Sequence, residues 1–393
     1  MDIIMHIDVN NAFLSWTAVY LLKKGYGMDI RNMEAIIGGD ESKRHGIVLA
    51  KSMVAKARGV KTAETIARAK RKCRKLEIFS PNYKLYKYMS NSLFNLIRKY
   101  TPDIEILSID ECFIDYGKVK NLYGDEIKFA YKLKKEIKDT LGFTVNIGIA
   151  NNKLCAKMAS DLLKPDRVHT LFSNEIEDKM YPLPINKLYG VGKKSTEKLL
   201  KLNINTIGDL ANTNPDDLVP YFKNMATKLV DSAKGISSSF INIKKEELQG
   251  ISNSTTTPYN LNSIDDINKV LLKIVDNLCM RLRKMDKYTN SVSVTLKDKY
   301  FKTKSHQMKL SNYTNNTDVI YDATKKLVKE LYNDESIRLV GVSLTKLSNN
   351  MNHQISIFDK QTNNELDKIV DELKETYGSN IINKASLIDN YQS

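Results

Sequence analysis

The sequence has few cysteines and histidines. Its 393 residues include four Cys and five His. The cysteines are far apart, and no pair has the Cys-x-x-Cys spacing of a zinc site. This pattern argues against a structural zinc site and against a disulfide framework. We therefore expect four reduced, mostly buried thiols in a cytoplasmic protein, at Cys73, Cys112, Cys155 and Cys279.

The sequence also lacks a long hydrophobic run. No apolar stretch reaches the roughly 18 residues that a membrane-spanning helix needs. The N-terminus begins Met1-Asp2-Ile3 and has no signal-peptide pattern. These two absences predict a protein without a membrane partner.

Acidic residues are fewer than basic residues. The chain has 61 Lys and Arg against 46 Asp and Glu, a net charge of +15. Such a charge favours a polyanionic partner such as nucleic acid. The abundance of Lys, Asn and Ile also indicates a compositional bias, so charge alone does not decide the partner. The length is enough for two to four domains with cores of their own.

Two adjacent carboxylates stand between two apolar stretches. We predict strands over residues 104–109 and 112–116, which places Asp110 and Glu111 at the tight turn between them. Adjacent acids repel each other unless a cation neutralises them, and hard oxygen ligands suit Mg²⁺. The alternative is a solvated acidic turn, which is the more common explanation of an isolated Asp-Glu pair.

A third carboxylate follows the first predicted strand. Residues 3–8 form an apolar run that ends in Asp8 and turns into a helix that contains Phe13. Two strands that end in carboxylates can lie side by side in one sheet. Three carboxylates placed there can hold two metal ions, which orient a phosphate chain and activate a hydroxyl.

These motifs resemble those of the Y-family of DNA polymerases. The resemblance rests on Asp8-Val9-Asn10-Asn11-Ala12-Phe13 and Ser108-Ile109-Asp110-Glu111, in this order and at this spacing. It extends from residue 1 to about residue 358. Within the family, the chain looks closer to the UmuC-like branch than to the DNA polymerase IV-like branch.

The resemblance implies an α+β fold with the shape of a right hand. The palm, residues 1–20 and 78–165, is expected to be ferredoxin-like, with helices at 84–100 and 125–140 and a last strand at 144–149. The fingers would be residues 21–77, the thumb 166–235 with a helix-hairpin-helix, and the linker 236–249. A second βαββαβ domain, the little finger, would cover 250–347, and a tail would follow at 348–393. Within that tail we expect residues 360–393 to form a helix and an end segment of unknown role.

The resemblance also implies the roles of the carboxylates. Asp8, Asp110 and the Val9 carbonyl would hold the metal ion of the nucleotide. Asp8, Asp110 and Glu111 would hold a second Mg²⁺ that lowers the pKa of the primer 3′-hydroxyl. Phe13 stands at the position of the family's steric gate against ribonucleotides, and its alternative role is core packing.

Two lysines stand at positions that bind the triphosphate in the family. Lys56 lies in the fingers motif, where polymerase IV-like members have Arg and the UmuC-like branch commonly has Lys. Met53 replaces the Tyr of polymerase IV-like members, so one hydroxyl contact with the nucleotide is lost. Lys164 precedes Pro165 at the end of a predicted helix, where it could instead neutralise the helix dipole.

The DNA contacts are predicted on two domains. Gly190 and Gly192, with Lys193, form a helix-hairpin-helix turn whose backbone N–H groups would bind a DNA phosphate without reading its sequence. On the little finger, the polar strands with Lys297, Lys302 and Lys304 would lie along phosphates. A solvated sheet face is almost as good an interpretation of the second pattern.

The tail contains a short peptide with a Gln, an aliphatic and an aromatic residue. Gln354, Ile357 and Phe358 resemble the sliding-clamp peptide of bacterial polymerases, in which the apolar pair fills a groove of the clamp. The partners implied are therefore primer–template DNA, a dNTP, the clamp (beta subunit) and accessory subunits, on which UmuC-like members can depend.

We therefore expect low-fidelity, template-directed DNA synthesis past damaged bases, without a proofreading exonuclease. Two alternatives remain. One is a catalytically weak family member that serves as a DNA- and clamp-binding module. The other is a different palm enzyme, a nucleotide cyclase, although a cyclase needs no DNA-binding domains. Gly38-Gly39-Asp40-Glu41 nearly matches a cyclase signature, but Ser42 replaces the expected Phe and no second half of a cyclase site follows, so we interpret this match as a coincidence of a turn.

Overall fold

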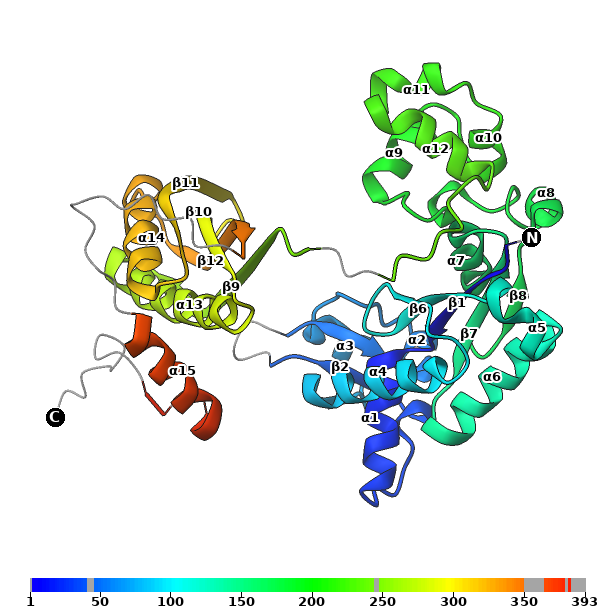
Figure 1. The fold of residues 1–393 in the computed structure, drawn as a ribbon, viewed down its shortest axis with the longest axis horizontal. Helices are drawn as coiled ribbons and strands as arrows, with labels where there is room; N and C mark the ends of the chain where they lie inside the picture. Colours follow the sequence, from blue (N-terminus) through cyan, green and yellow to red (C-terminus); the bar gives the residue numbers. More distant parts are fainter. Residues whose placement is uncertain (1, 41–45, 244–246, 350–363, 379–380, 383–393) are drawn as a thin grey trace. The chain divides into compact units, whose positions relative to one another are not determined.

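The structure is a computed structural model that describes residues 2–40, 46–243, 247–349, 364–378 and 381–382. The chain divides into two compact units. Of the described residues, the first unit contains 2–39 and 46–243, and the second contains residue 40 and residues 247–349, 364–378 and 381–382 (Figure 1). In the described part of the chain, no helix is long and apolar enough to cross a membrane.

The first unit is built on a five-stranded sheet. Its strand order is β5-β6-β1-β7-β8, and β1 pairs antiparallel with both β6 and β7. The first four strands in this order have the ferredoxin-like arrangement expected for the palm. The strands are β1 (Ile4–Val9), β5 (Ile104–Ile106), β6 (Glu111–Asp115), β7 (Val145–Ala150) and β8 (Val168–Thr170).

The alternation of side chains along β1 decides which face of the sheet each residue meets. Met5 and Ile7 belong to the core that α1 (Ala12–Lys23), α4 (Tyr83–Arg98) and α6 (Glu126–Leu141) cover. Ile4 belongs to the opposite core, which α7 (Lys153–Leu162) covers. Asp8, which has the same parity as Ile4, therefore points toward the α7 face.

Two details differ from the predicted palm. The first strand of the β5–β6 hairpin ends at Ile106 and not at residue 109, because the N–H groups of Leu107 and Ser108 both turn back to the carbonyl of Glu111. Strand β8 joins the palm sheet beside β7, although its residues lie in the range predicted for the thumb. The predicted helices at 84–100 and 125–140 are confirmed as α4 and α6.

A small sheet with the order β3-β2-β4 follows α1. Its middle strand pairs antiparallel with β3 and parallel with β4, and α3 packs an apolar side on it through Ile66 and Ala69. The elements are β2 (Ala35–Gly38), β3 (Val48–Lys51), α2 (Met53–Ala57), α3 (Ile66–Lys72) and β4 (Glu77–Phe79). These elements occupy the range predicted for the fingers.

Five short helices complete the first unit. They are α8 (Ile176–Lys179), α9 (Lys193–Lys201), α10 (Ile207–Ala211), α11 (Pro215–Phe222) and α12 (Ala226–Ala233). Leu199, Ile207 and Val230 anchor them in the same core as α7. The segment that follows α12 stays packed against the first unit, because Ile241 is buried in that core. The first part of the predicted polar linker is therefore not a free connection.

The second unit is a four-stranded antiparallel sheet with two helices on one face. The element order βαββαβ is as predicted, and the strand order is β11-β10-β12-β9. Val292, Val294 and Leu296 on β10 point into the core beneath the helices. The elements are β9 (Gly250–Leu261), α13 (Ile264–Lys284), β10 (Tyr288–Asp298), β11 (Thr303–Thr314), α14 (Thr317–Leu331) and β12 (Ile337–Ser348).

The helix expected within residues 360–393 is present as α15 (Asn364–Tyr377), which packs on α13. The contact is largely ionic. Arg283, whose side chain is 7% exposed, pairs with Asp367 and Asp371, and Lys374 pairs with Asp276. These charge-assisted bonds hold α15 on the second unit, so that this stretch is not a free tail.

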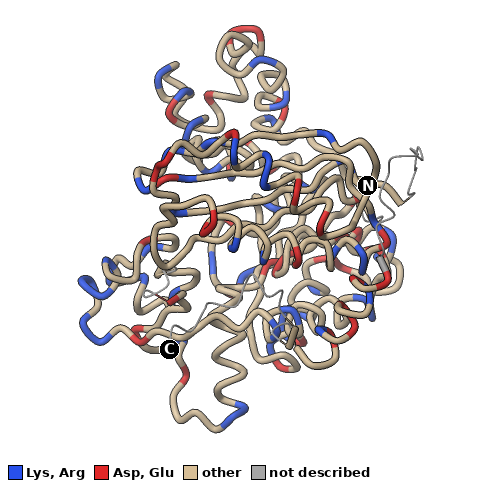
Figure 2. Tube along the Cα trace, turned by 90° about the vertical axis from the view of Figure 1, so that its left-hand side faces the viewer, with Lys and Arg blue, Asp and Glu red and all other residues tan. Residues whose placement is uncertain are grey.

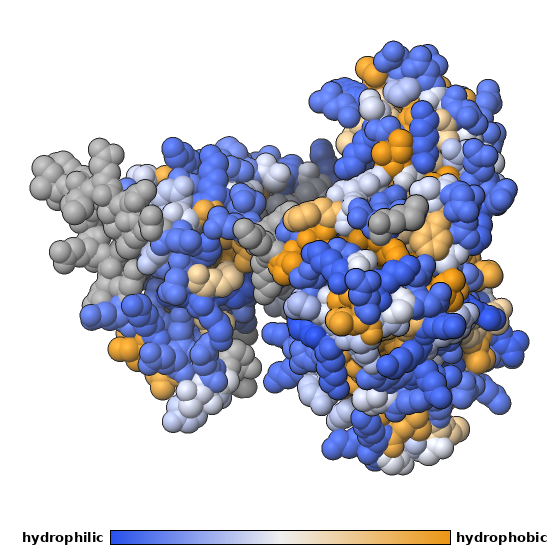
Figure 3. Space-filling model, turned by 45° about the vertical axis from the view of Figure 1, so that its right-hand side comes forward, coloured by the Kyte–Doolittle hydropathy of each residue, from blue (hydrophilic) through white to orange (hydrophobic). Residues whose placement is uncertain are grey.

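Basic residues are distributed over many elements of the trace (Figure 2). On the face drawn in Figure 3, hydrophilic residues predominate and the hydrophobic ones lie in separate groups. The four cysteines are free and buried, as predicted.

Candidate active site

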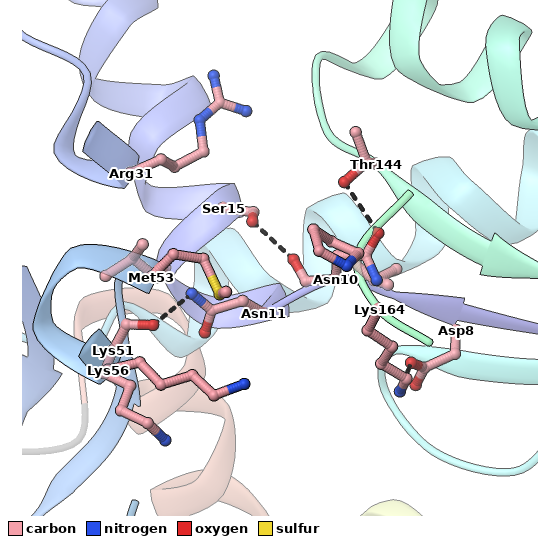
Figure 4. A pocket seen from close by; sticks show the side chains of 13 residues that line it. Asp8, Asn10, Asn11, Ser15, Arg31, Lys51, Met53, Lys56, Thr144 and Lys164 are labelled. Atoms are coloured by element: carbon pink, nitrogen blue, oxygen red, sulfur yellow. Dashed lines mark hydrogen bonds and ion pairs between the residues drawn. The ribbon is translucent and has the colours of Figure 1, made fainter. Parts of the chain in front are cut away.

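A pocket of about 310 Å³ opens at the end of β1 (Figure 4). The pocket brings together four of the residues predicted for the site, namely Asp8, Val9, Lys56 and Lys164. Its lining comes from the palm range on one side and from the fingers range on the other. The complete lining is Asp8, Val9, Asn10, Asn11, Leu14, Ser15, Arg31, Lys51, Met53, Lys56, Thr144, Lys164 and Pro165.

Asp8 is a buried carboxylate with one strong cationic partner. Its side chain is 14% exposed and accepts a hydrogen bond from Nζ of Lys164. Burial raises the pKa of Asp8, and the neighbouring ammonium of Lys164 opposes that rise only in part. A buried acid in this state favours any additional cation that reaches it.

Lys164 follows the last turn of α7. Besides Asp8, it contacts Oδ1 of Asp161 at 2.7 Å. Burial disfavours its charged form, but the two carboxylates outweigh burial and raise the pKa of Lys164. The ammonium is therefore firmly charged, and it points to Asp8 in Figure 4.

Glu111 begins β6 and lies directly opposite Asp8 in the register of β1 and β6. Lys157 Nζ donates to Oε2 of Glu111 at 2.5 Å. His6 Nε2 lies 3.2 Å from the same oxygen, although this contact lacks good hydrogen-bond geometry. The interactions with His6 and Lys157 lower the pKa of Glu111 to about 2. Glu111 is thus ionised and already neutralised by protein groups.

The His6 ring is fixed from its other side. Nδ1 of His6 lies in hydrogen-bond contact with Oγ of Ser160 at 2.8 Å, and the Ser160 hydroxyl also lies 2.8 Å from the carbonyl of Lys157. The ring also packs on Phe113, with centroids 4.7 Å apart. Neither His6 nor Lys157 was predicted as a site residue. The sequence indicates only the position of His6, because residues 6 and 8 of one strand lie on the same face. It gives no such indication for Lys157.

Asp110 occupies the turn before β6. Ser108 donates its hydroxyl to Oδ1 of Asp110 at 2.5 Å, and the Asp110 carbonyl accepts the N–H of Val9 at 3.0 Å. This last bond ties the β5–β6 turn to the end of β1. The turn predicted from the sequence is confirmed for Asp110, whereas Glu111 is already in the strand.

The donor chemistry of these residues fits Mg²⁺, which prefers carboxylate and carbonyl oxygens. Within the described ranges, no group of three or more His, Cys, Asp or Glu side chains is arranged to hold a metal ion. Each carboxylate instead has its own protein partner. A metal ion at Asp8 would take the place that the Lys164 ammonium now holds.

The fingers side of the pocket contributes cations. Lys51, at the end of β3, and Lys56, on α2, both line it together with Met53. Burial and the nearby charge of Lys56 lower the pKa of Lys51. Lys51 was not predicted as a site residue, because only the fold of the fingers brings β3 to the pocket.

Two further residues place the fingers against the palm. Asn11 adopts a left-handed backbone conformation (φ 52°) and its side-chain amide donates to the carbonyl of Lys51 at 2.6 Å. Arg31 pairs with Asp29 and donates to the carbonyl of Gly142 at 2.9 Å. These bonds join segments that are far apart in the sequence around one pocket.

Phe13 lies beside the pocket and does not line it. Its ring stacks on Tyr86 with centroids 4.4 Å apart and an interplanar angle of 9°. The core-packing role of Phe13 is therefore observed, and the steric-gate role stays a prediction.

The helix-hairpin-helix turn has the expected backbone. Gly190 has φ 90°, a conformation that favours glycine, and Gly192 caps α9. Val191 between them is buried and anchors the turn, while the Lys193 side chain is 91% exposed. The turn thus presents the first N–H groups of α9 to solvent.

The predicted DNA-binding lysines of the second unit differ from one another. Lys302 is exposed, Lys297 is partly buried, and Lys304 pairs with Glu335 at 2.7 Å. Their DNA contacts stay a prediction. The predicted clamp-binding residues Gln354, Ile357 and Phe358 lie outside the described residues.

Family models and full-length relatives match this chain in sequence. The model of the impB/mucB/samB family matches residues 7–161, the C-terminal domain of that family matches 248–357, and its HHH motif matches 173–204. The DNA polymerase IV of Clostridium acetobutylicum is 44% identical over 391 residues, 98% of each chain. That of Alkaliphilus oremlandii is 34% identical over 400 residues, covering 98% of this chain and 99% of the relative.

Solved structures share the fold. A Y-family DNA polymerase chimera, Dbh-Dpo4(243-245)-Dbh, aligns with a TM-score of 0.76 and 22% identity over 88% of this chain and 98% of its own. An insertion ternary complex of Dbh DNA polymerase aligns with a TM-score of 0.60 and 24% identity over 87% and 98%. The predicted right-hand α+β architecture is confirmed.

The branch within the family needs a correction. Met53 and Lys56 suggested the UmuC-like branch, but full-length relatives bear the name DNA polymerase IV. Two positions in one short motif are weaker evidence than identity along the whole chain. By its family models and its full-length relatives, the chain belongs to the impB/mucB/samB family, within the Y-family of DNA polymerases.

Proposed function

We propose that this protein is a DNA-directed DNA polymerase that extends a primer 3′-hydroxyl with dNTPs and copies past damaged template bases. The observation that carries the proposal is one pocket that is lined both by three lysines, Lys51, Lys56 and Lys164, and by the buried carboxylate of Asp8. Three ammonium groups offset the charge of a triphosphate, and the carboxylate requires a cation.

Each residue would have a distinct part. Lys51 and Lys56 would bind the triphosphate from the fingers side, and Lys164 would exchange Asp8 for a phosphate oxygen. Mg²⁺ ions held by Asp8, Asp110, Glu111 and the Val9 carbonyl would lower the pKa of the primer hydroxyl and orient the α-phosphate. His6 and Lys157 would keep Glu111 ionised and in place.

The remaining assignments extend the proposal beyond the pocket. The α9 N-terminus, with Gly190, Gly192 and Lys193, would bind a DNA phosphate. Phe13, held by its stack on Tyr86, would reject the 2′-hydroxyl of a ribonucleotide. The protein would work in the cytoplasm and bind the sliding clamp through residues 354–358.

Primer extension by the purified chain tests the proposal. The reaction contains Mg²⁺, four dNTPs and either an undamaged or an abasic template. We expect extension on both templates, and its loss in Asp8→Asn and Asp110→Asn. Asp139→Asn is the matched control, because Asp139 is exposed on α6 and does not line the pocket. Phe13→Ala should incorporate ribonucleotides.

The outcome also separates the alternatives. Extension that survives Asp8→Asn would refute the assignment of the carboxylates. DNA binding without extension, with and without the sliding clamp, would indicate the non-catalytic binding module. Extension of the undamaged template alone would restrict the activity to ordinary synthesis.

A further inference from the structure

The hairpin between β10 and β11 carries two aromatic side chains into solvent. Lys297 pairs with Thr303 across the hairpin, and residues 299–302 form its tip. Tyr300 is 79% exposed and Phe301 is 65% exposed. Among the large apolar and aromatic side chains that the structure describes, Tyr300 is the most exposed.

Hydrogen bonds fix the backbone of the tip, although its two aromatic side chains pack little against the rest of the protein. Oδ1 of Asp298 accepts the N–H of Tyr300 at 2.8 Å and that of Lys302 at 2.9 Å. The N–H of Phe301 donates to the Asp298 carbonyl at 3.1 Å, and Phe301 is held at φ 66°. A bulky residue in this region of φ is strained. Strain and exposed aromatic surface together indicate a functional role.

Cations accompany both rings. Nζ of Lys299 lies 5.1 Å from the centre of the Tyr300 ring, and the Arg338 guanidinium lies 5.0 Å from that of Phe301. Lys302, at the end of the tip, is exposed. In the described ranges, none of these three cations is paired with an acidic side chain. The tip therefore combines flat apolar faces with unneutralised positive charge.

We propose that this tip is a binding site for single-stranded DNA. Tyr300 stacks on the face of an unpaired base, and Lys299, Lys302 and Arg338 offset the adjacent phosphates. Bases inside a duplex are already stacked on their neighbours, so an exposed ring can reach only an unpaired one. The choice of DNA as the nucleic acid rests on the proposed polymerase function.

The test uses the full chain and two labelled ligands, a single-stranded pyrimidine 20-mer and a 20-base-pair duplex. Tyr300→Leu keeps the apolar bulk but removes the ring. We expect it to weaken single-strand binding about five- to 100-fold, and to leave duplex binding unchanged. Tyr377→Leu is the matched control, because Tyr377 is 68% exposed on α15.

A second variant detects stacking directly. Trp16 is the only tryptophan of the chain and is fully buried, so its emission is insensitive to a bound base. In Tyr300→Trp, we expect the added indole emission to be quenched by the single strand and not by the duplex.

Three outcomes would overturn the inference: no quenching, equal loss of affinity for single strand and duplex in Tyr300→Leu, or an equal loss in Tyr377→Leu. Primer extension by the wild type is measured in parallel. Its absence would refute the polymerase function, while single-strand binding at the tip would still be decided by the quenching.

Discussion

Asp8 and Glu111, which lie opposite each other on β1 and β6, have opposite effects on the stability of the metal-free protein. The pKa of Glu111 is lowered from 4.5 to about 2 by its interactions with His6 and Lys157, and burial raises the pKa of Asp8. The charge of Glu111 therefore stabilises the fold, and the charge of Asp8 destabilises it. We predict that Glu111→Gln destabilises the protein, whereas Asp8→Asn leaves its stability unchanged or raises it.

The magnitude follows from the lowered pKa of Glu111. The difference between 4.5 and about 2 corresponds to roughly 3 kcal/mol at neutral pH. Water reaches part of the carboxylate, whose side chain is 17% exposed, so we expect about 1–2 kcal/mol. Because the pKa is lowered on folding, this stabilisation is complete above pH 4.5 and is lost as the pH falls toward 2.

Urea unfolding followed by Trp16 fluorescence provides the assay. Trp16 is the single tryptophan and lies in the core of the first unit, so its emission reports the unfolding of that unit. The control is Asp139→Asn, an exposed acid on α6, with an expected change under about 0.5 kcal/mol. A Glu111→Gln variant as stable as the wild type at pH 7 would refute the reasoning, as would a difference that grows below pH 4.

Three further predictions concern other parts of the chain. In Gly148→Ala, the added Cβ would lie 2.0 Å from the carbonyl oxygen of Ala156 on α7. We expect the free energy of unfolding in urea to fall by about 3 kcal/mol or more. The control Gly27→Ala should be neutral, because nothing lies within 4 Å of its Cβ. Arg283→Met removes the buried partner of two acids on α15 and should expose that helix to trypsin; equal cleavage in the exposed-pair control Lys284→Met would contradict this. Met53→Tyr adds a hydroxyl in the pocket and should lower the KM for dNTP about two- to tenfold, whereas Met53→Phe should not; an unchanged KM in both would place the nucleotide elsewhere.

The α15 contact shows where sequence reasoning stopped. The sequence predicts a helix within residues 360–393, but no motif indicates what that helix contacts. In the structure, Arg283 lies close to both Asp367 and Asp371, one helical turn apart. An ion pair between residues more than 80 positions apart has no signature in either segment.

Helix α6 shows a similar limit on a smaller scale. Its periodicity predicts a buried stripe, and Ala130, Leu133 and Ile137 are buried as expected. Ile127 and Tyr131, which fit the same pattern, are 40% and 53% exposed, and Phe129 is buried in their place. Periodicity fixes the approximate face of a helix, but the neighbouring elements decide its edges.

By itself, the sequence determined the family, the order of the elements, and the carboxylates at the ends of β1 and of the β5–β6 turn. Those features depend on local patterns of apolar and acidic residues, which can be recognised within a few residues of sequence. Only the tertiary structure decided what each carboxylate contacts, namely Lys164 at Asp8, and His6 and Lys157 at Glu111. It also decided that Lys51 lines the same pocket. The physical reason is that Coulomb energy and burial depend on distances in space, and these distances exist only once β1, β3, β6 and α7 have packed together.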